Sequence, residues 1–335
     1  MIDWVTAILP CDHDPSKLIS GMVMSFDAKG ESEWVVNKKL TVEGSHSTKI
    51  QIKSHTDSQI WISGNPAKFL QGHNIFGTDD LSYLMGRFFD ALLTHDELGL
   101  TPTDVQYESI QAGRYSLKRV DINQSWLLRN RDDVLSWIRS AGACARLKHR
   151  GAGQYSGDTL YFAKHSRRWS VKCYSKGSEI NAKGHQLPKD LQVPELIEWA
   201  DRALRLELVL RSMQLKDMML DIGSNWCSDT AKVLLCSLVL DNLELSDNMT
   251  IKCDILDTLP VRLRLVYQSW LSGEDLRKIM SKTAFYRWRK QLLEYGIDIA
   301  ILNQDNRSNV VPLIRYLEAE PAQIPDWAYE KRLVA

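Results

Sequence analysis

Three segments that lie far apart in the sequence alternate apolar and polar residues with a period of two. They span 118–123, 159–177 and 205–211. Successive side chains of a β-strand point to opposite faces of its sheet, so each segment is predicted to form a strand with one apolar face, and 159–177 two strands joined by a basic turn. Helices predicted at 132–140 and 194–203 would cover the apolar faces. The fold class indicated is α+β, an antiparallel sheet with helices on one face.

The polar faces of these strands would then converge on one exposed surface of the sheet. That surface would bear Asp121, Tyr174 and Glu207, one from each segment. An alternative stays open for the third segment, because residues 194–220 also fit one long helix in which Glu207 is an ordinary helix acid. Periodicity alone does not separate a buried strand from a helix in a short apolar run.

The N-terminal third of the chain is predicted to contain a strand, an antiparallel meander and two helices. The strands, bounded by Gly and Ser, are 3–9, 33–42, 48–52 and 59–63. A short helix begins after Asn65-Pro66, and a longer helix spans 80–93, where apolar residues recur with helical spacing.

The C-terminal part of the chain differs in character from the rest. At about 150 residues per domain, 335 residues indicate two domains, which we place at 1–255 and 256–335. In the second, a short helix at 274–280, a tight turn and a basic aromatic helix at 283–295 form a helix-turn-helix pattern. The predicted DNA contacts of that helix are Thr283, Tyr286, Arg287 and Lys290. The alternative is an amphipathic helix that only packs against its neighbours.

Positive charge is concentrated in one region, although the chain carries 42 Lys and Arg against 42 Asp and Glu. Between Arg146 and Lys189 there are ten basic residues and two acids, with tyrosine and tryptophan interleaved. Such a surface can neutralise phosphates and stack bases. The alternative is a solvated basic face balanced by acids elsewhere in the fold. The predicted DNA contacts on the sheet are Arg119, Arg167, Arg168 and Arg205.

Several classes of protein are excluded by the sequence. No apolar run approaches the ~20 residues that span a membrane, and the opening MIDWVTAILP has no basic region before its apolar residues. The six cysteines are scattered without a Cys-x-x-Cys pair, and there is no His-x-His pair. We therefore expect reduced thiols in a cytoplasm, no zinc site of these kinds and no membrane partner.

Tyr174 has predicted surroundings that suit the transesterification of a phosphodiester. Tyrosine is a poor nucleophile, with a pKa of about 10, so it needs nearby positive charge or a metal. Lys172 and Lys176 lie one strand repeat on either side of it. A divalent cation held by Asp121 and Glu207 would stabilise charge on the phosphate oxygens, and carboxylate ligands suit Mg²⁺ or Mn²⁺. The alternative is a structural role, because the chain has eleven tyrosines.

At these residues the sequence resembles the replication initiators of filamentous bacteriophages, of the gene II and gene X type, which nick and rejoin DNA during rolling-circle replication. The resemblance extends from residue 1 to about 327. It is carried, in order, by MIDW, NPAKFLQGHNIFGTDDL, RVDIN, TLYFAKHSRRWSVKCYSKG, RLELVLRS and SNVVPLIRYLEAEPAQIPDW. The blocks PAKFLQGHNIFG and NVVPLIRY are the most specific.

The resemblance implies a relaxase-like fold related to the HUH nicking enzymes of rolling-circle plasmids, although this chain lacks their His-x-His pair. Tyr174 would become attached to the 5′ phosphate at the nick, with Asp121 and Glu207 as metal ligands. Ser175 stands where plasmid relatives often have an acid, so the third ligand is left open. The candidates are Glu179, which we favour, Asp3, His165 and a water. Four residues of the PAKFLQGHNIFG block are placed at the site without an assigned role: Lys68, Gln71, His73 and Asn74.

The function implied is a metal-dependent nickase and strand-joining enzyme that acts at the phage plus-strand origin. It would bind double-stranded origin DNA and single-stranded DNA in the cytoplasm of a host bacterium, together with a host helicase, polymerase and single-strand-binding protein. The alternative is a non-catalytic DNA-binding replication regulator or repressor. Only the enzyme would depend on the hydroxyl of Tyr174.

Overall fold

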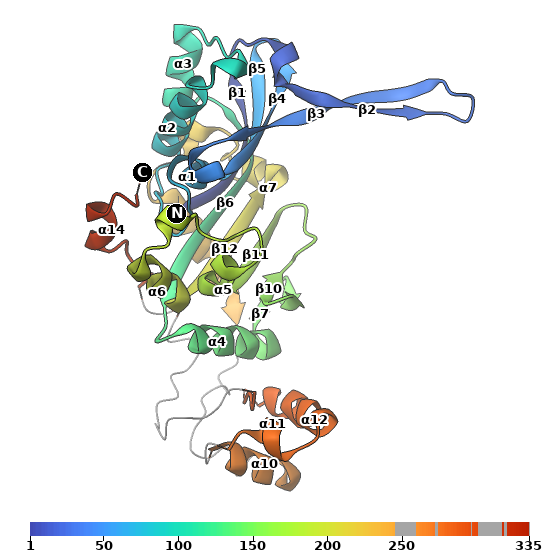
Figure 1. Cartoon of the computed structure of the whole chain (residues 1–335), viewed down its shortest axis with the longest axis vertical. Coiled ribbons are helices and arrows are strands. Elements are labelled where there is room, and N and C mark those ends of the chain that lie inside the picture. Colours follow the sequence, from blue (N-terminus) through green and yellow to red (C-terminus); the bar gives the residue numbers. More distant parts are fainter. Residues whose placement is uncertain (245–258, 272–273, 296, 301–316, 318–319, 335) are drawn as a thin grey trace.

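A ten-stranded antiparallel sheet forms the body of the protein (Figure 1). The computed structural model describes residues 1–244, 259–271, 274–295, 297–300, 317 and 320–334. The strand order is β2-β3-β4-β5-β1-β6-β12-β11-β10-β9. The central strands are β1 (Ile2–Pro10), β6 (Ser116–Leu127), β12 (Ala203–Arg211) and β11 (Trp169–Ser175). The predicted α+β class and the three alternating segments are confirmed.

The outer strands include the predicted meander. They are β2 (Ile19–Phe26), β3 (Ser32–Glu43), β4 (Lys49–Thr56), β5 (Gln59–Gly64), β9 (Gln154–Ser156) and β10 (Thr159–Phe162). A small second sheet contains β13 (Leu243–Glu244), β7 (Arg146–Leu147) and β8 (Gly151–Ala152). The sequence did not predict β2, because this strand has apolar residues on both faces and therefore shows no alternation.

The helices of the body are α1 (Pro66–Gln71), α2 (Leu81–Leu93), α3 (Asp104–Gln111), α4 (Arg131–Cys144), α5 (Lys176–Asn181), α6 (Pro194–Arg202), α7 (Ser212–Asp217) and α8 (Thr230–Leu238). Only α1, α2, α4 and α6 lie at predicted positions, and the other four were not predicted. Asn65 caps α1 through its side chain and Asp80 caps α2, as their sequence signals indicate.

The alternative of one long helix over 194–220 is wrong. Helix α6 ends at Arg202, and β12 begins at the next residue. β12 pairs with β6 on one side and with β11 on the other. A helix there would leave two strand edges in the middle of the sheet without hydrogen-bond partners, which is costly for buried backbone groups.

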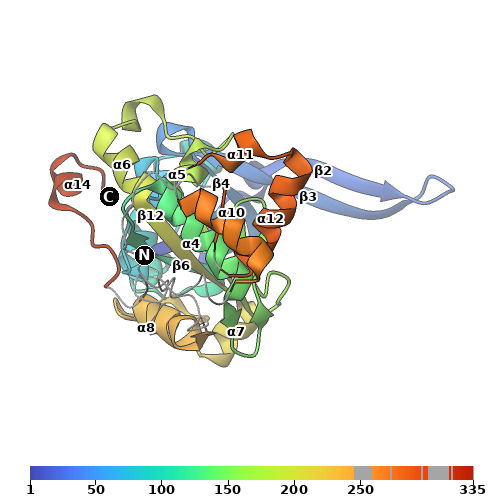
Figure 2. The ribbon, with the colours of Figure 1, turned by 90° about the horizontal axis from the view of Figure 1, so that it is seen from below.

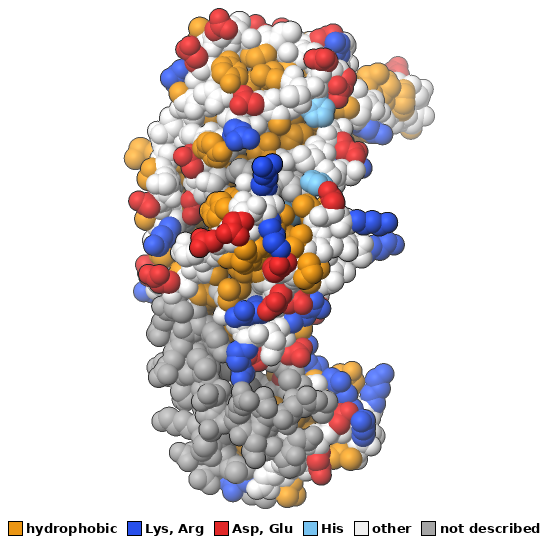
Figure 3. Space-filling model, turned by 60° about the vertical axis from the view of Figure 1, so that its left-hand side comes forward, with side chains coloured by type: hydrophobic (Ala, Val, Ile, Leu, Met, Phe, Trp, Pro, Cys, Tyr) orange, Lys and Arg blue, Asp and Glu red, His pale blue; other side chains and the backbone are white. Residues whose placement is uncertain are grey.

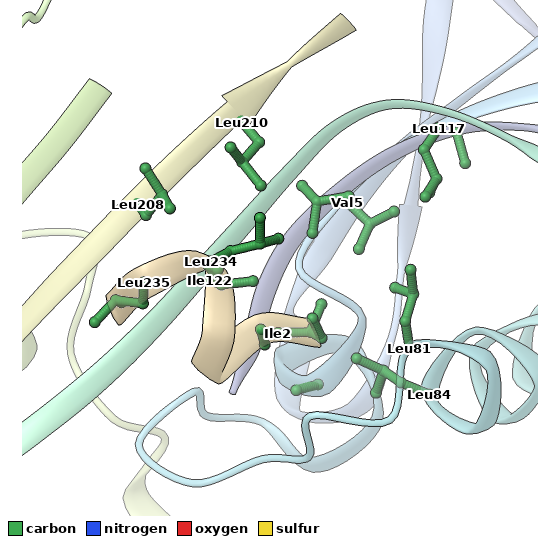
Figure 4. Packing of buried hydrophobic residues seen from close by; sticks show 14 of the residues in the cluster. Ile2, Val5, Leu81, Leu84, Leu117, Ile122, Leu208, Leu210, Leu234 and Leu235 are labelled. Carbon is green, nitrogen blue, oxygen red and sulfur yellow. The ribbon is translucent and has the colours of Figure 1, made fainter. Parts of the chain in front are cut away.

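One face of the sheet carries the main hydrophobic core. Ile122 of β6 and Leu208 and Leu210 of β12 point to this face and lie near Leu234 and Leu235 of α8 (Figure 4). Helices α2 and α4 contribute to the same core. The opposite face of β6, β12 and β11 carries the polar side chains. At one end of it α6 packs on Ala203 through Leu196 and Trp199, so the prediction that this helix covers the apolar face is wrong.

Three helices near the C-terminal end share an apolar cluster of their own, and we call them the C-terminal module. They are α10 (Val261–Leu271), α11 (Leu276–Ile279) and α12 (Lys282–Leu293). Figure 1 shows α10 and α12 below α4, and in the view from below they lie in front of α4 (Figure 2). The predicted boundary at 255/256 lies outside the described residues, so it stays a prediction.

The last residues return to the body. Ala328 and Leu333, in and after α14 (Asp326–Glu330), belong to a second apolar cluster with Phe76 and Trp199. The amide of Ala322 donates to the carbonyl of Ser125 in β6, at 2.8 Å. The NVVPLIRY block, residues 309–316, lies outside the described residues. No helix in the described part of the chain is long and apolar enough to cross a membrane.

Leu208→Ala is expected to lower the free energy of unfolding by about 2–5 kcal/mol, because it opens a cavity where β12 packs against the core. Chemical denaturation measures this change. Val233→Ala on α8 serves as the control, because Val233 is 58% exposed and a surface change away from special features costs about 0.5 kcal/mol or less. Equal losses in both variants would contradict the core assignment.

Candidate active site

The strand register places the predicted site residues on one face of the sheet. Glu207 of β12 lies directly between Asn123 of β6 and Lys172 of β11. Tyr174 lies two residues after Lys172 on β11, and Asp121 lies two residues before Asn123 on β6. Side chains two residues apart share a face, so the expected convergence of Asp121, Tyr174 and Glu207 is confirmed. The prediction that this surface is exposed is wrong, because all three side chains are buried.

Glu207 is the centre of this group. Its side chain is buried, and it accepts hydrogen bonds from the Lys172 ammonium at 2.5 Å and from the Tyr174 hydroxyl at 3.2 Å. Burial, followed by the nearby charge of Asp121, raises the pKa of Glu207 above its ordinary value of 4.5, whereas Lys172 opposes the rise. The site thus holds a carboxylate with an increased affinity for protons beside a phenol.

Tyr174 is a neutral phenol in this arrangement. Burial and the charge of Glu207 raise its pKa well above 10. The prediction that two lysines make it phenolate-like is wrong, because Lys172 is paired with Glu207. Lys176 is not on the strand either: β11 ends at Ser175, and Lys176 begins α5.

Asp121 is held by the arginine two residues before it. The Arg119 guanidinium donates to both carboxylate oxygens, at 2.7 and 2.5 Å. Burial raises the pKa of Asp121, and the hydrogen bonds and charge of Arg119 act against this rise. Arg119 also lies 5.6 Å from the centre of the Trp4 ring.

A bulge in β1 brings a third acid to the same face. Ile2 pairs with Ile122 and Val5 pairs with Val120, so two residues of β1, Asp3 and Trp4, lie opposite the single residue Asp121. Both line the pocket described below. Asp3 accepts hydrogen bonds from the side-chain amides of Asn65 (2.5 Å) and Asn74 (2.9 Å).

Lys176 is a fully buried cation beneath the site. Its ammonium donates to the side-chain oxygen of Asn74, at 2.7 Å, and pairs with Glu179. Burial lowers its pKa to about 8, although Glu179 opposes this. Asn74 therefore connects Lys176 with Asp3, because its amide nitrogen donates to Asp3 and its amide oxygen accepts from Lys176.

The loop that carries Asn74 is fixed by hydrogen bonds to its backbone carbonyls. The Gln71 amide donates to the carbonyls of His73 (3.1 Å) and Phe76 (2.8 Å). The buried Arg205 guanidinium donates to the carbonyls of Asn74 (2.5 Å) and Ile75 (2.7 Å). The Ile75 amide donates to Nδ1 of His73, at 3.2 Å, and burial lowers the pKa of His73 to about 4. The PAKFLQGHNIFG block therefore builds one wall of the site.

The prediction that Arg205 contacts DNA is wrong. Its side chain is 0% exposed, and a third hydrogen bond joins it to the Ser125 hydroxyl at 3.1 Å. A guanidinium has five N–H donors in a fixed fork, which suits it to holding several oxygens inside a protein.

These residues surround an open pocket of about 580 Å³. Lys68, Arg119 and Lys172 supply positive charge to its lining, and Trp4 and Tyr161 supply aromatic surface. Cations and rings of this kind bind phosphates and bases. The pocket can therefore accommodate a segment of a nucleic acid strand next to the Tyr174 hydroxyl.

The carboxylates suit a divalent cation. Asp121 raises the pKa of Glu207, and Asp3 raises the pKa of both, so a positive ion among them would relieve like-charge repulsion. Among the described residues, no three His, Cys, Asp or Glu side chains are grouped closely enough to hold an ion by themselves. Waters would complete the coordination. Glu179 lines the pocket, but Lys176 and His185 pair with its carboxylate.

The other predicted DNA contacts of the sheet lie around the β10–β11 hairpin. Arg167 is exposed in the turn, and Arg168 pairs with Asp217 of α7. Lys164 lies 4.7 Å from the centre of the Tyr161 ring, which keeps a cation at the pocket wall. His165, an alternative metal ligand, is exposed in the same turn and is not among the residues that line the pocket.

The C-terminal module exposes a basic helix face. The four predicted contacts on α12 are exposed: Thr283, Tyr286, Arg287 and Lys290. Arg289 points elsewhere, because it pairs with Asp298 at 2.7 Å, and Asp298 also pairs with Arg139 of α4 at 3.1 Å. Asp298 thus connects the module to the body, and no sequence pattern signalled this role.

The chain matches two family models of one replication-associated protein of phages, the N-terminal model over residues 1–229 and the C-terminal model over residues 258–334. It is 40% identical over 334 residues to the replication-associated protein of Enterobacteria phage I2-2, covering 97% of this chain and 95% of that protein. The replication-associated protein of Enterobacteria phage M13 is 24% identical over 388 residues, covering 95% and 92%. A rolling-circle replication initiator protein from Geobacillus stearothermophilus is similar in structure, with a TM-score of 0.33 and 11% identity, covering 75% of this chain and 88% of that chain.

The raised pKa of Glu207 makes stability depend on pH. In the folded state this carboxyl keeps a proton that the unfolded chain releases, so its contribution is present below pH 4.5 and is lost as the pH rises through the raised pKa. In metal-free buffer, the wild-type free energy of unfolding, measured relative to Glu207→Gln, should fall by about 1–3 kcal/mol between pH 5 and pH 8, at about 1.4 kcal/mol per pKa unit. Urea unfolding measures it. If the free energy of unfolding changes with pH in the same way for the wild type and for Glu207→Gln, the raised pKa of Glu207 is contradicted. Glu198→Gln, at an exposed position on α6, is the control.

Proposed function

The chain belongs to the family of phage replication-associated proteins, and from this premise we propose that it initiates rolling-circle DNA replication by nicking and rejoining one strand of an origin. In this proposal the nick is made by Tyr174, which becomes covalently attached to the 5′ phosphate. The proposal also makes the protein a functional relative of the HUH nicking enzymes, with acids on β6 and β12 in place of their histidines.

One observation carries the proposal: the Tyr174 hydroxyl donates to the buried carboxylate of Glu207 inside a pocket whose lining holds three cations as well as five acids. A phenol is a nucleophile once a base removes its proton, and a carboxylate with a raised pKa is a suitable base near neutral pH. Lys172 and Arg119 line the same pocket and would attract the phosphate. The pocket thus brings together the attacking oxygen of Tyr174, the carboxylate of Glu207 that accepts its proton, and the positive charges that would bind the phosphate.

In the proposed step the phenol oxygen of Tyr174 attacks phosphorus, and its proton passes to Glu207. The new bond joins tyrosine to the 5′ phosphate, and the bond from phosphorus to the 3′ oxygen breaks. The 3′ oxygen takes a proton from water and leaves as a hydroxyl. Since one phosphate ester replaces another, attack by a 3′ hydroxyl on the tyrosine ester can rejoin the strand without another energy source.

The two lysines have different roles in this proposal. Lys172 is partly exposed to the pocket, so its ammonium can turn from Glu207 to an incoming phosphate. Lys176 is 0% exposed and contacts Asn74 and Glu179. It acts as a positioning residue that fixes the wall behind Tyr174.

Mg²⁺ or Mn²⁺ is the proposed cofactor, held by Asp121 and Glu207 with Asp3 as the nearby third acid. A bound ion would polarise the phosphate and stabilise the charge on its oxygens. The support is the carboxylate chemistry of the site and the repulsion among its acids. Arg119 and Lys172 neutralise two of these acids when no ion is bound.

The proposed DNA partners are the double-stranded origin and the single strand that is cut. The basic hairpin around Arg167 and the exposed face of α12 would hold the duplex, and the pocket would take the scissile strand. Relatives named replication-associated proteins of enterobacterial phages support action in the cytoplasm of a host bacterium. A helicase, a polymerase and a single-strand-binding protein of the host would then extend and displace the nicked strand.

Tyr174→Phe should abolish nicking of a supercoiled plasmid that carries the origin of the same genome. The variant lacks the attacking oxygen, so both relaxed circles and the protein-DNA adduct should be lost, as they should be for the wild type in EDTA. Gel electrophoresis separates the products. Tyr161→Phe is the matched control, because Tyr161 lines the same pocket and should keep activity within a few-fold.

Each other result has a defined meaning. Nicking by Tyr174→Phe but not by Tyr161→Phe would move the nucleophile to Tyr161. Origin binding without cleavage by the wild type in either Mg²⁺ or Mn²⁺ would replace the enzyme with a non-catalytic regulator.

Arg287→Ala combined with Lys290→Ala should weaken binding to the duplex origin and reduce the salt dependence of log K by about one for each lost phosphate contact. Fluorescence anisotropy over a range of salt concentrations measures both. Cleavage of a single-stranded oligonucleotide should be unchanged. Lys216→Ala with Lys232→Ala removes the same charge from exposed positions on α7 and α8. If both pairs lower affinity equally, α12 is not a specific DNA contact.

A further inference from the structure

A two-stranded arm projects from the body. It consists of residues 19–39, which are β2 and the first part of β3 (Figure 1). Along the arm, β3 pairs with β2 alone, and it joins β4 only from Leu40 to Glu43. The turn at its tip is closed by the Asp27 carboxylate, which accepts from the amides of Lys29 and Glu31, both at 2.8 Å. The arm is therefore an ordered ribbon that no described helix covers.

Both faces of the arm are apolar and exposed. Met24 and Val35 lie opposite each other on one face of the arm, and Val23 and Val36 lie opposite each other on its other face. The exposed apolar residues of the arm are Met22, Val23, Met24, Phe26, Trp34, Val35 and Val36, at 42–61% exposure. Figure 3 shows hydrophobic side chains on the projection. Apolar surface gathered in this way marks an interaction site.

The outer edge of the arm is unprotected. β2 is the end strand of the sheet, and its second edge meets no strand in the described part of the chain. Residues 18–26 contain no charged residue and no proline. Edge strands normally carry such residues, because free N–H and C=O groups otherwise pair with a strand of another molecule. A bulge at Ser20 and Gly21 interrupts the edge near the base of the arm, and the regular stretch from Met22 to Ser25 is left free to accept a strand.

Charge along the arm indicates which strand it accepts. The tip carries Asp27, Glu31 and Glu33 against Lys29, a net charge of −2, whereas Lys17, Lys38 and Lys39 lie at the base. Two arms placed antiparallel would bring each acidic tip to the basic base of the other. A negatively charged tip also disfavours DNA as the occupant, since DNA is itself a polyanion.

We propose that the arm pairs with the arm of a second copy of this chain. The two β2 strands would lie antiparallel about a two-fold axis and make a four-stranded ribbon. With the axis between Met22 and Val23, Phe26 lies opposite Ile19 of the other copy, and Asp27 lies beside Lys17. Such a contact uses the same patch on both copies, as a two-fold interface requires. The inference concerns assembly and does not rest on the proposed chemistry.

Sedimentation of the full chain up to about 200 µM tests the proposal, because it detects contacts with a Kd in that range. The wild type should form dimers. Met22→Lys with Met24→Lys should weaken them at least tenfold, because the ribbon face becomes charged. Val233→Lys, an equally exposed position on α8 (58%), should leave them unchanged. Thermal unfolding confirms that each variant folds, since the arm lies outside the core.

A charge-reversal experiment distinguishes self-pairing from other occupants. Asp27→Lys alone and Lys17→Asp alone each place like charges at both ends of the contact, so each protein by itself should be monomeric. Mixed together, they should form a heterodimer, because both contacts become attractive. Because Asp27→Lys also removes the carboxylate that closes the turn, Asp27→Asn, which keeps a side-chain oxygen there, is its control and should dimerise more tightly than Asp27→Lys.

Two results would overturn the proposal. One is a wild type that stays monomeric over the whole range, with and without DNA. The other is a set of arm variants that lose DNA affinity while their association state matches that of the wild type, which would make the arm a DNA contact. Nicking by Tyr174 is measured separately, so failure of either proposal leaves the other standing.

Discussion

The site depends on the central position of β12. Only because this strand lies between β6 and β11 does Glu207 meet Lys172 and Tyr174 from one side and the strand of Asp121 from the other. Its alternation sends leucines into the core and leaves Glu207 and Arg205 on the polar face. A slip of one residue in either pairing would turn these side chains into the core, so core packing and site geometry are held by the same register.

Buried cations hold the walls of the site. Arg205 fixes the loop of Asn74 through two backbone carbonyls, and Lys176 fixes Asn74 itself. Both cations are fully buried, and a buried charge without partners is costly. The loop is therefore rigid because its oxygens are needed to compensate these charges. That explains why a sequence block without nucleophile or metal ligand of its own belongs to the site.

Without substrate, the charges around Tyr174 do not favour its deprotonated form. Tyr174 keeps its proton, and the basic groups nearest the acids are occupied, Lys172 by Glu207 and Arg119 by Asp121. A phosphate that enters the pocket competes for these cations, and a metal ion would compete for the acids. In the proposed strand transfer, substrate binding and activation of the nucleophile would be linked by this exchange of ion-pair partners.

The sequence alone determined much of the local structure, namely the alternation of β6 and β11 and the positions of helices α1 and α2, because these follow from backbone periodicity and local start signals. It placed Asp121, Tyr174 and Glu207 on one face only on the condition that the segment of Glu207 is a strand. It left open whether 203–211 is strand or helix, and only the pairing partners of β12 decided that. The burial of Arg205, the place of Lys176 in α5 and the raised pKa of Tyr174 could not be predicted, because they depend on neighbours far away in the chain. Asp3 reached the site through a bulge, and Asp298 joined the C-terminal module to the body through Arg139 and Arg289. Desolvation and ion pairing depend on three-dimensional surroundings, which a one-dimensional pattern does not contain.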